Sequence, residues 1–357
     1  MRKKILLTFS LSLAILCIAG QNLKTFADSI RIAYHIPELN YAVLSSDSVI
    51  ELQSLGYKKI NSGMAATIDD RFRIGSNTKA ITGFIAAQLV KQGKISWQTN
   101  FFDAFPELKR SAKSVYYNMT LLDLLSFRNS FMQYSYPNKK PGEHQFKGNE
   151  DVQRRKFVIW ALKQNPNPSL KEIRFSNIGY AAAAMMLEKV SGKTYKQLAQ
   201  ELGASLQMDI QFGNPNYTDT LQPWGHDNNL VPEPPANNYK LNWLRAAGNI
   251  NLSIKDYAKF IQLQLKGLKG KSDILPLQDF TFLHYGLPHF AVGWFWELNE
   301  NNHKVSHSTG NPGTFLSKVC VIGEVDRAYI ILTNVQSDEA AKGIDILLEE
   351  LKTRYGQ

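Results

Sequence analysis

The chain is poor in cysteine, with Cys17 and Cys320 as the only two among 357 residues. Removal of a leader that contains Cys17 would leave one cysteine, which excludes an internal disulfide, so stability must come from packing. Cys320 lies in the strand-like run 318–322, and this predicts a buried thiol rather than a nucleophile. No His-Glu-x-x-His motif or phosphate-binding glycine loop occurs, so the sequence implies no metal and no other cofactor.

Acidic residues are absent before Asp28, whereas Arg2-Lys3-Lys4 form a basic start that is followed by the mostly apolar run 5–20. This pattern is typical of a secretory signal peptide, and we expect cleavage near Ala27. The apolar run is shorter than the roughly 20 residues that span a membrane. The protein is therefore expected to be exported, to the periplasm or the medium, although retention of the leader as an anchor stays open. Leu16 stands where a lipoprotein signal has a small residue, so lipidation of Cys17 is not expected.

Positive charge exceeds negative charge, with 41 Lys and Arg against 31 Asp and Glu, a formal charge of +10. Four of the basic residues precede Asp28, so their loss leaves +6. The remaining basic residues form short, scattered clusters such as Lys58-Lys59 and Lys139-Lys140. This distribution favours a solvated surface over a nucleic-acid groove.

The order of expected elements is strands, a block of helices, further strands and a closing helix. Strands are predicted at 41–45, 49–55, 290–296, 315–322 and 328–333, and the last helix near Ser337. Pairing of the first strands with the last predicts an α/β (α+β) fold, an antiparallel sheet flanked by helices with an inserted helical region. We expect a single domain at 28–357, its helical region at about 100–250 and a cleft where the two parts meet.

A candidate nucleophile lies at the start of a predicted helix, in the sequence Phe72-Arg-Ile-Gly-Ser76-Asn-Thr-Lys79. Three residues make almost one helical turn, so Lys79 should lie beside Ser76. A partly desolvated lysine can take the proton that a serine hydroxyl must lose before it attacks a carbonyl. The alternative is a capping serine followed by a surface lysine.

Around this motif the chain resembles the serine β-lactamase and penicillin-binding-protein-like hydrolases, in particular the class C β-lactamase, D-Ala-D-Ala carboxypeptidase and esterase branch. The resemblance extends over nearly the whole mature chain and implies a β-lactamase/transpeptidase-like fold. It rests on the following segments: 72–80, 88–95, 119–126, Arg174-Phe-Ser-Asn-Ile-Gly-Tyr180, 246–250 and Ser306-His-Ser-Thr-Gly-Asn-Pro-Gly313.

The resemblance implies roles for several residues in acyl-enzyme chemistry. Ser76 attacks the carbonyl, Lys79 takes its proton, and the Asn177 amide binds substrate and Lys79. The amide N–H of Ser76 and one from the strand 308–310 would bind the oxyanion. Substrate contacts are expected from Ser308, Gly310 and Phe175.

The sequence departs from the family pattern at two of these positions. Phe175 stands where the family has a tyrosine, and a phenyl ring can relay no proton. The third motif reads His307-Ser308-Thr309, with threonine in place of glycine, unless the motif is shifted so that Gly310 fills that place. We expect His307 to replace the missing phenol as proton donor. His303 lies four residues before it, but the Asn, Gly and Pro residues nearby are not helical, so no metal site is expected.

Two functions are consistent with these residues. The first is an exported serine hydrolase that acts on a peptide, ester or β-lactam, with activity reduced by Phe175. The second is a catalytically impaired relative that binds cell-wall peptides or a protein partner. The implied partner in the first case is a small-molecule or peptide substrate, and the sequence decides neither its identity nor the oligomeric state.

Overall fold

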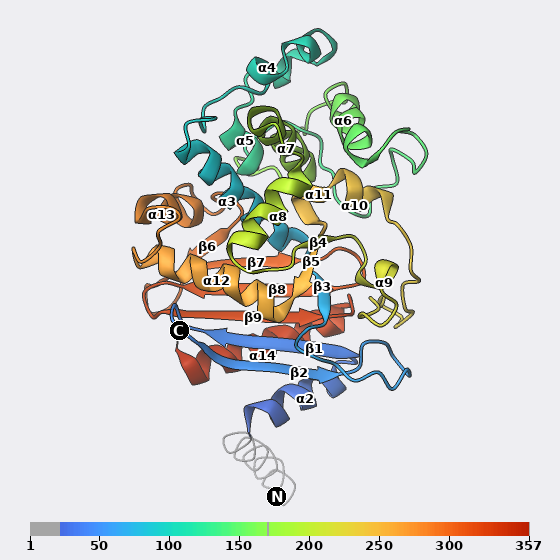
Figure 1. The fold of residues 1–357 in the computed structure, drawn as a ribbon, viewed down its shortest axis with the longest axis vertical. Coiled ribbons are helices and arrows are strands. Elements are labelled where there is room, and N and C mark those ends of the chain that lie inside the picture. Colours follow the sequence, from blue (N-terminus) through green and yellow to red (C-terminus); the bar gives the residue numbers. More distant parts are fainter. Residues whose placement is uncertain (1–21, 170, 357) are drawn as a thin grey trace, which may run out of the picture.

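The two ends of the chain meet in one antiparallel sheet in the computed structural model, which describes residues 22–169 and 171–356 (Figure 1). The sheet has six strands in the order β2-β1-β9-β8-β7-β6. Strand β1 pairs with β9, Leu39 opposite Thr333, as the sequence predicted. The strands are β1 (Glu38–Leu44), β2 (Val49–Gly56), β6 (Phe295–Leu298), β7 (Lys304–Gly310), β8 (Leu316–Ile322) and β9 (Arg327–Thr333).

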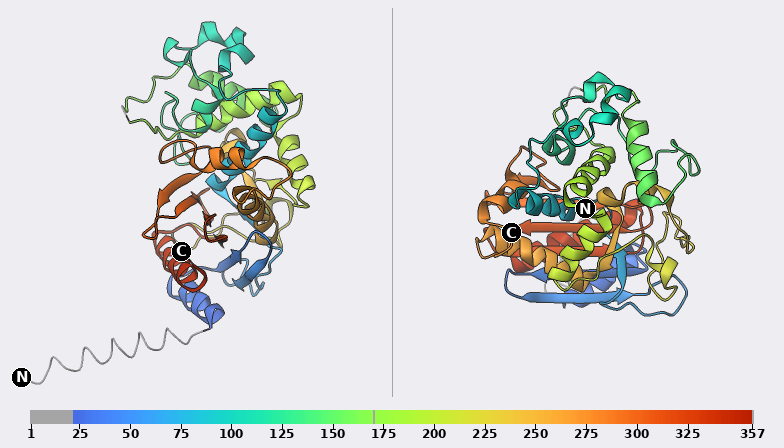
Figure 2. Two further views of the ribbon diagram at one scale, coloured as in Figure 1. Left: turned by 90° about the vertical axis from the view of Figure 1, so that its left-hand side faces the viewer. Right: turned by 45° about the horizontal axis from the view of Figure 1, so that its top comes forward.

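Helices cover both faces of this sheet. One face carries α2 (Leu23–Ala33) and α14 (Asp338–Tyr355), and the opposite face carries α12 (Ile254–Leu268) (Figures 1 and 2). The side chains of Ser253 and Ser337 cap α12 and α14 by accepting backbone N–H bonds, because each serine lies just before the first turn. The apolar stripe of α14 packs against β9 and α2 and forms a second core, separate from the one around the helical region.

The inserted helical region lies beyond the sheet, in the upper half of Figure 1. A small three-stranded sheet, in the order β3-β5-β4, connects it to the main sheet. The small sheet consists of β3 (Arg71–Arg73), β4 (Gln211–Phe212) and β5 (Ile250–Ser253). The helical elements are α4 (Phe101–Ala104), η2 (Pro106–Ser111), η3 (Ser114–Tyr116), α5 (Leu121–Leu125), α6 (Glu150–Ala161), α7 (Asn177–Ser191), α8 (Tyr195–Ser205), α9 (Pro215–Thr218), α10 (Tyr239–Trp243), α11 (Arg245–Gly248) and α13 (Leu277–Tyr285).

Helix α3 (Thr78–Lys91) runs through the centre of the molecule and follows a single 3₁₀ turn, η1 (Gly75–Asn77). Its apolar side chains at Ile81, Phe84 and Ile85 are buried, and so are the polar side chains of Thr78 and Thr82. Helices α7, α8, α11 and α13 contact it. The start of α3 therefore lies where the sheet and the helical region meet.

The predicted signal peptide lies mostly outside the described residues, because its basic start, its apolar run and Cys17 all precede residue 22. Ala27 lies inside α2 and is fully buried, together with Leu23 and Phe26 of the same helix. Cleavage at Ala27 would remove those two side chains from the second core, and the cleavage point stays a prediction. Within residues 22–169 and 171–356, no helix has the length and apolarity required to cross a bilayer.

Candidate active site

Ser76 and Lys79 lie side by side at the entrance to α3. The Lys79 Nζ donates a hydrogen bond to the Ser76 Oγ at 2.9 Å and a second to the Ala247 carbonyl of α11 at 2.7 Å. Gly75 has φ +51, and a Cβ there would lie 2.8 Å from the Asn311 backbone nitrogen. Glycine therefore permits both the left-handed backbone and the close approach of the chain beyond β7. The arrangement brings a hydroxyl and an amine within proton-transfer distance.

The amine of Lys79 lies in an apolar environment. The residue is 2% exposed, and the Nζ lies 5.4 to 6.0 Å from the ring centroids of Tyr180, Phe175 and Phe127. Among the described residues, no carboxylate forms a salt bridge with it. Burial lowers the pKa of Lys79 from 10.5 to about 7, because the charged form loses its hydration. The aromatic faces compensate for part of that loss by cation–π attraction.

Ser76 and Lys79 open into a cavity of about 650 Å³ between the sheet and the helical region. Its lining comes mainly from four directions: η1 with the start of α3, the segment 127–137 with the start of α7, the segment 290–295 at the start of β6, and the end of β7 with the turn after it. The lining residues are Ser76, Lys79, Phe127, Ser135, Tyr136, Pro137, Phe175, Asn177, Phe290, Gly293, Phe295, Ser308, Thr309, Asn311, Gly313 and Gln336. The size suits a small organic molecule.

Asn177 is the first residue of α7 and lines the cavity, where the sequence placed it. Its backbone N–H donates to the Tyr134 carbonyl at 3.0 Å. Its Oδ1 is buried and has no hydrogen-bond partner among the described residues, and it makes no bond to Lys79. The expected link between Asn177 and Lys79 is therefore absent from this structure, and the oxygen is left available for a bound molecule.

Strand β7 supplies Ser308, Thr309 and Gly310, and the structure favours the shifted motif. Ser308 and Gly310 are on the face of β7 that is turned toward α3, since Ser308 pairs with Val319 of the central core. A Cβ at Gly310 would lie 1.9 Å from the Ile74 carbonyl oxygen, directly before η1. Gly310, rather than residue 309, is thus the position where glycine lets the strand approach the nucleophile.

His307 does not reach the cavity, contrary to the expectation that it replaces the missing phenol. It alternates with Ser308 along β7, so it faces the α14 side of the sheet, opposite Cys320 and beside Phe295. Burial lowers its pKa, and the charges that act on it are those of Glu297, Lys318 and Lys352. His307 is not among the residues that line the cavity, so the structure gives its proton-donor role no direct support.

Aromatic rings form one wall of the cavity. Phe127 lies 4.9 Å from Phe175 and 4.4 Å from Phe290, and Phe290 lies 4.6 Å from Phe295, measured between ring centroids. Phe127 has φ +59, a conformation uncommon for a bulky aromatic residue. Phe175 is 36% exposed, so the ring in the family's tyrosine position faces open space in the cavity.

Sequence reasoning missed much of the site, including the aromatic side chains of Phe290 and Phe295 in its wall. The Ala247 carbonyl holds Lys79, and Tyr136 and Asn311 line the cavity. The resemblance included 246–250 and Asn311 as motif segments but attached no role to them. A backbone carbonyl has no side-chain signature, and Tyr136 lies in a loop without regular structure, so neither had a signal that spacing could detect.

Comparison with known proteins agrees with this architecture. The profile of the Beta-lactamase family matches residues 21–352. Protein flp of Staphylococcus aureus strain MW2 is 23% identical over 327 residues, which are 90% of this chain and 63% of that protein. The chain thus spans less than two thirds of the length of these relatives.

Solved structures share the fold. A class C β-lactamase from Rhodobacter sphaeroides superposes with TM-score 0.72 at 17% identity, over 93% of this chain and 99% of that one. A D-amino acid amidase from Ochrobactrum anthropi SV3 superposes with TM-score 0.73 at 17% sequence identity, over 94% of this chain and 99% of that one. The octameric penicillin-binding protein homologue of Pyrococcus abyssi superposes with TM-score 0.74 at 18% sequence identity, over 92% of this chain and 77% of that one. With an antiparallel sheet, an inserted helical region and a family match along almost its whole length, this chain belongs to the Beta-lactamase family of serine hydrolases.

Proposed function

We propose that this protein is an exported serine hydrolase that forms an acyl-enzyme on Ser76. The observation that carries the proposal is the 2.9 Å contact between the Ser76 Oγ and the desolvated amine of Lys79, at the floor of an open cavity. With a pKa of about 7, a large fraction of Lys79 is neutral near neutral pH and able to accept a proton. Export rests on the basic and apolar pattern before Asp28.

The chemistry uses few groups. Neutral Lys79 takes the proton of Ser76 while the Oγ bonds to the carbonyl carbon. The oxyanion is bound by the Ser76 amide, which belongs to the first turn of η1, and by an amide at the end of β7, where Asn311 lines the cavity. The bond to the leaving group then breaks, and protonated Lys79 returns the proton to the departing atom. Water hydrolyses the acyl-enzyme, and this releases the acid and frees Ser76.

Phe175 limits the site to substrates whose leaving group departs without being protonated by a separate acid. A phenyl ring supplies no proton, and His307 is not among the residues that line the cavity, so we assign both the base and the acid step to Lys79. Loss of a separate proton relay costs about 10²–10⁴ in rate. We therefore propose hydrolysis of activated esters before amides, whose amine must be protonated as it leaves.

The test is covalent labelling. The protein is incubated separately with a fluorescent penicillin and a fluorophosphonate, and intact mass with peptide mapping locates any adduct. We expect an adduct on Ser76 with at least one probe and none in Ser76→Ala. Absence of labelling by both reagents in the folded native protein would refute the proposal.

The second candidate is a binding protein for cell-wall peptides or a protein partner, and Phe175 is the observation that favours it. Ser76→Ala separates the two functions in cells. A hydrolase loses its phenotype with this substitution, whereas a binding protein keeps it, because removal of one hydroxyl leaves the cavity in place.

A further inference from the structure

The cavity has little charge in its lining, and this affects which substrates it can bind. Lys79 is the sole Lys, Arg, His, Asp or Glu among the described residues that line it. We infer that the substrate is an uncharged ester or thioester with an apolar acyl group of about the size of a phenyl ring, an inference that rests on the proposed function. Acyl donors that carry a carboxylate near the scissile bond are poor substrates.

Lys79 cannot serve as a counter-ion for a substrate carboxylate while it acts as the base. Its Nζ is held by the Ser76 hydroxyl and the Ala247 carbonyl, and its side chain is almost fully buried. A carboxylate that enters the cavity would leave water without gaining a cationic partner. Such a transfer is strongly unfavourable.

Two cations that bond to the backbone of lining residues are already engaged. Lys240 donates to the Tyr136 carbonyl at 3.0 Å, on the backbone of a cavity-lining residue. Arg128 donates to the Phe290 carbonyl at 2.8 Å and pairs with Glu172. These side chains hold the cavity walls from outside and do not line it.

The wall itself favours an apolar group. Phe127, Phe175, Phe290 and Phe295 form a continuous chain of ring contacts, and Phe175 presents more than a third of its surface. Tyr136 and Pro137 also line this cavity, so aromatic and apolar surface comes from a second segment. Burial of this surface by a phenyl-sized acyl group removes it from water, which favours binding.

The polar side of the cavity is neutral as well. Ser308 offers a hydroxyl, Asn177 and Gln336 offer amides, and the Asn177 Oδ1 has no partner among the described residues. These groups can hydrogen-bond to an ester carbonyl or an alcohol oxygen, but they cannot neutralise a full negative charge.

A pair of thioesters isolates the charge. S-phenylacetyl thioglycolic acid and its methyl ester share acyl group and sulfur, and differ by one carboxylate; thiol release is followed with a disulfide dye. Native protein should hydrolyse the methyl ester with a kcat/KM at least tenfold higher than the acid. Ser308→Lys, which adds a cation to the lining, should reduce this ratio at least tenfold.

The control for Ser308→Lys is Ser205→Lys, which adds the same charge at the exposed end of α8, outside the cavity lining, and should leave the ratio unchanged. Equal or faster hydrolysis of the acid by native protein would overturn the inference and leave the proposed function intact. Failure of both thioesters together with no probe adduct on Ser76 would refute the proposed function itself. The native ratio decides the inference even if a variant does not fold.

Substitution of acetyl for phenylacetyl in the methyl ester tests the size of the acyl group. It should lower kcat/KM at least tenfold, and an equal rate would overturn the assignment of an aromatic-sized acyl group.

Discussion

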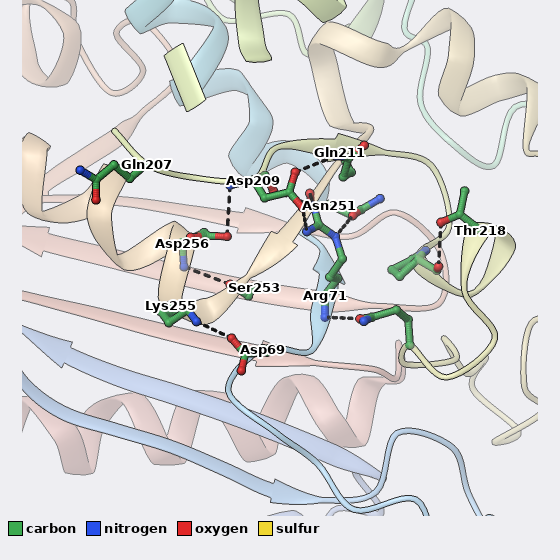
Figure 3. A network of polar contacts seen from close by, with 12 residues as sticks. Asp69, Arg71, Gln207, Asp209, Gln211, Thr218, Asn251, Ser253, Lys255 and Asp256 are labelled. Carbon is green, nitrogen blue, oxygen red and sulfur yellow. Dashed lines mark hydrogen bonds and ion pairs between the residues drawn. The ribbon is translucent and has the colours of Figure 1, made fainter. Parts of the chain in front are cut away.

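Two partly or fully buried cations, Arg71 and Lys79, lie near the junction of the sheets. Their side chains have opposite kinds of partner. Arg71 of β3 lies in a dense polar network (Figure 3). Its guanidinium donates to the Asp209 carboxylate at 2.7 Å, to the Asn251 side chain at 2.8 Å and to two backbone carbonyls. Lys79 has one hydroxyl, one carbonyl and aromatic rings.

The difference in partners sets the difference in chemistry. Burial lowers the pKa of Arg71 too, but Asp209 and Asp256 oppose that shift, and a guanidinium stays charged in either case. No anionic group among residues 22–169 and 171–356 opposes the desolvation of Lys79. One cation thus fastens β3 to β5 and the segment before β4, while the other is poised to lose its proton. The comparison suggests that a reactive lysine can be recognised by a buried amine that has no carboxylate partner.

Removal of the reactive cation should give the largest effect. Lys79→Met keeps the side-chain length and deletes the base, so we expect the rate of Ser76 acylation to fall by at least about 10³-fold. The same variant should unfold at an equal or higher temperature, because a buried amine that is costly to charge has been replaced by an apolar group. Probe labelling and thermal denaturation measure the two effects. Retained acylation would show that Lys79 is not the base.

Gly310→Ala should come next in magnitude. The added Cβ would meet the Ile74 carbonyl oxygen at 1.9 Å, so β7 must move away from η1 and from Ser76. We expect acylation to fall by about 10²-fold, as small displacements of catalytic groups do. Gly323→Ala, where the nearest atom would be a leucine Cβ at 3.3 Å, is the matched control. Equal rates for the two variants would contradict the close approach at Gly310.

Removal of the Arg71 guanidinium should have the opposite effect to Lys79→Met, because it should lower stability and leave acylation almost unchanged. Arg71→Met deletes the bonds to Asp209 and Asn251 and leaves the buried side-chain oxygen of Asn251 without its donor, so we expect a loss of about 2 kcal/mol in the free energy of unfolding. Acylation of the folded variant should change less than threefold. Urea denaturation and probe kinetics below the transition check both parts. A loss of acylation without a loss of stability would mean that Arg71 acts on the site directly.

The local part of the site was readable from the sequence, whereas the part that depends on register was not. Ser76 and Lys79 are three residues apart at a helix start, so helical geometry alone brings them together. The pairing of the first and last strands and the start of the last helix near Ser337 followed from pattern in the same way. The position of His307 could not be predicted, because the faces of β7 invert with a shift of one residue and the hydrophobic pattern of Lys304–Gly310 is too polar to fix the register.

Phe175→Tyr should have the smallest effect. Phe175 is partly exposed in the cavity and its ring centroid lies 5.7 Å from the Lys79 Nζ, so a hydroxyl can be added and can enter the proton path. We expect acylation by an amide or β-lactam to rise by up to about tenfold, and thioester hydrolysis to change little because a thiolate leaves without a proton. An unchanged or reduced amide rate would show that the cavity is built around the phenyl ring.

The central claim is that Lys79 is the base and that burial brings its pKa near neutrality. The pH dependence of Ser76 acylation by an uncharged thioester, between pH 5 and 10, tests it most directly. The rate should rise as pH increases through about 7, where Lys79 becomes neutral, and level off above it. His307→Gln should show the same inflection, since that ring lies on the other face of the sheet. A rate that is flat across this range, or that rises only near the ordinary lysine pKa of about 10.5, would contradict the account.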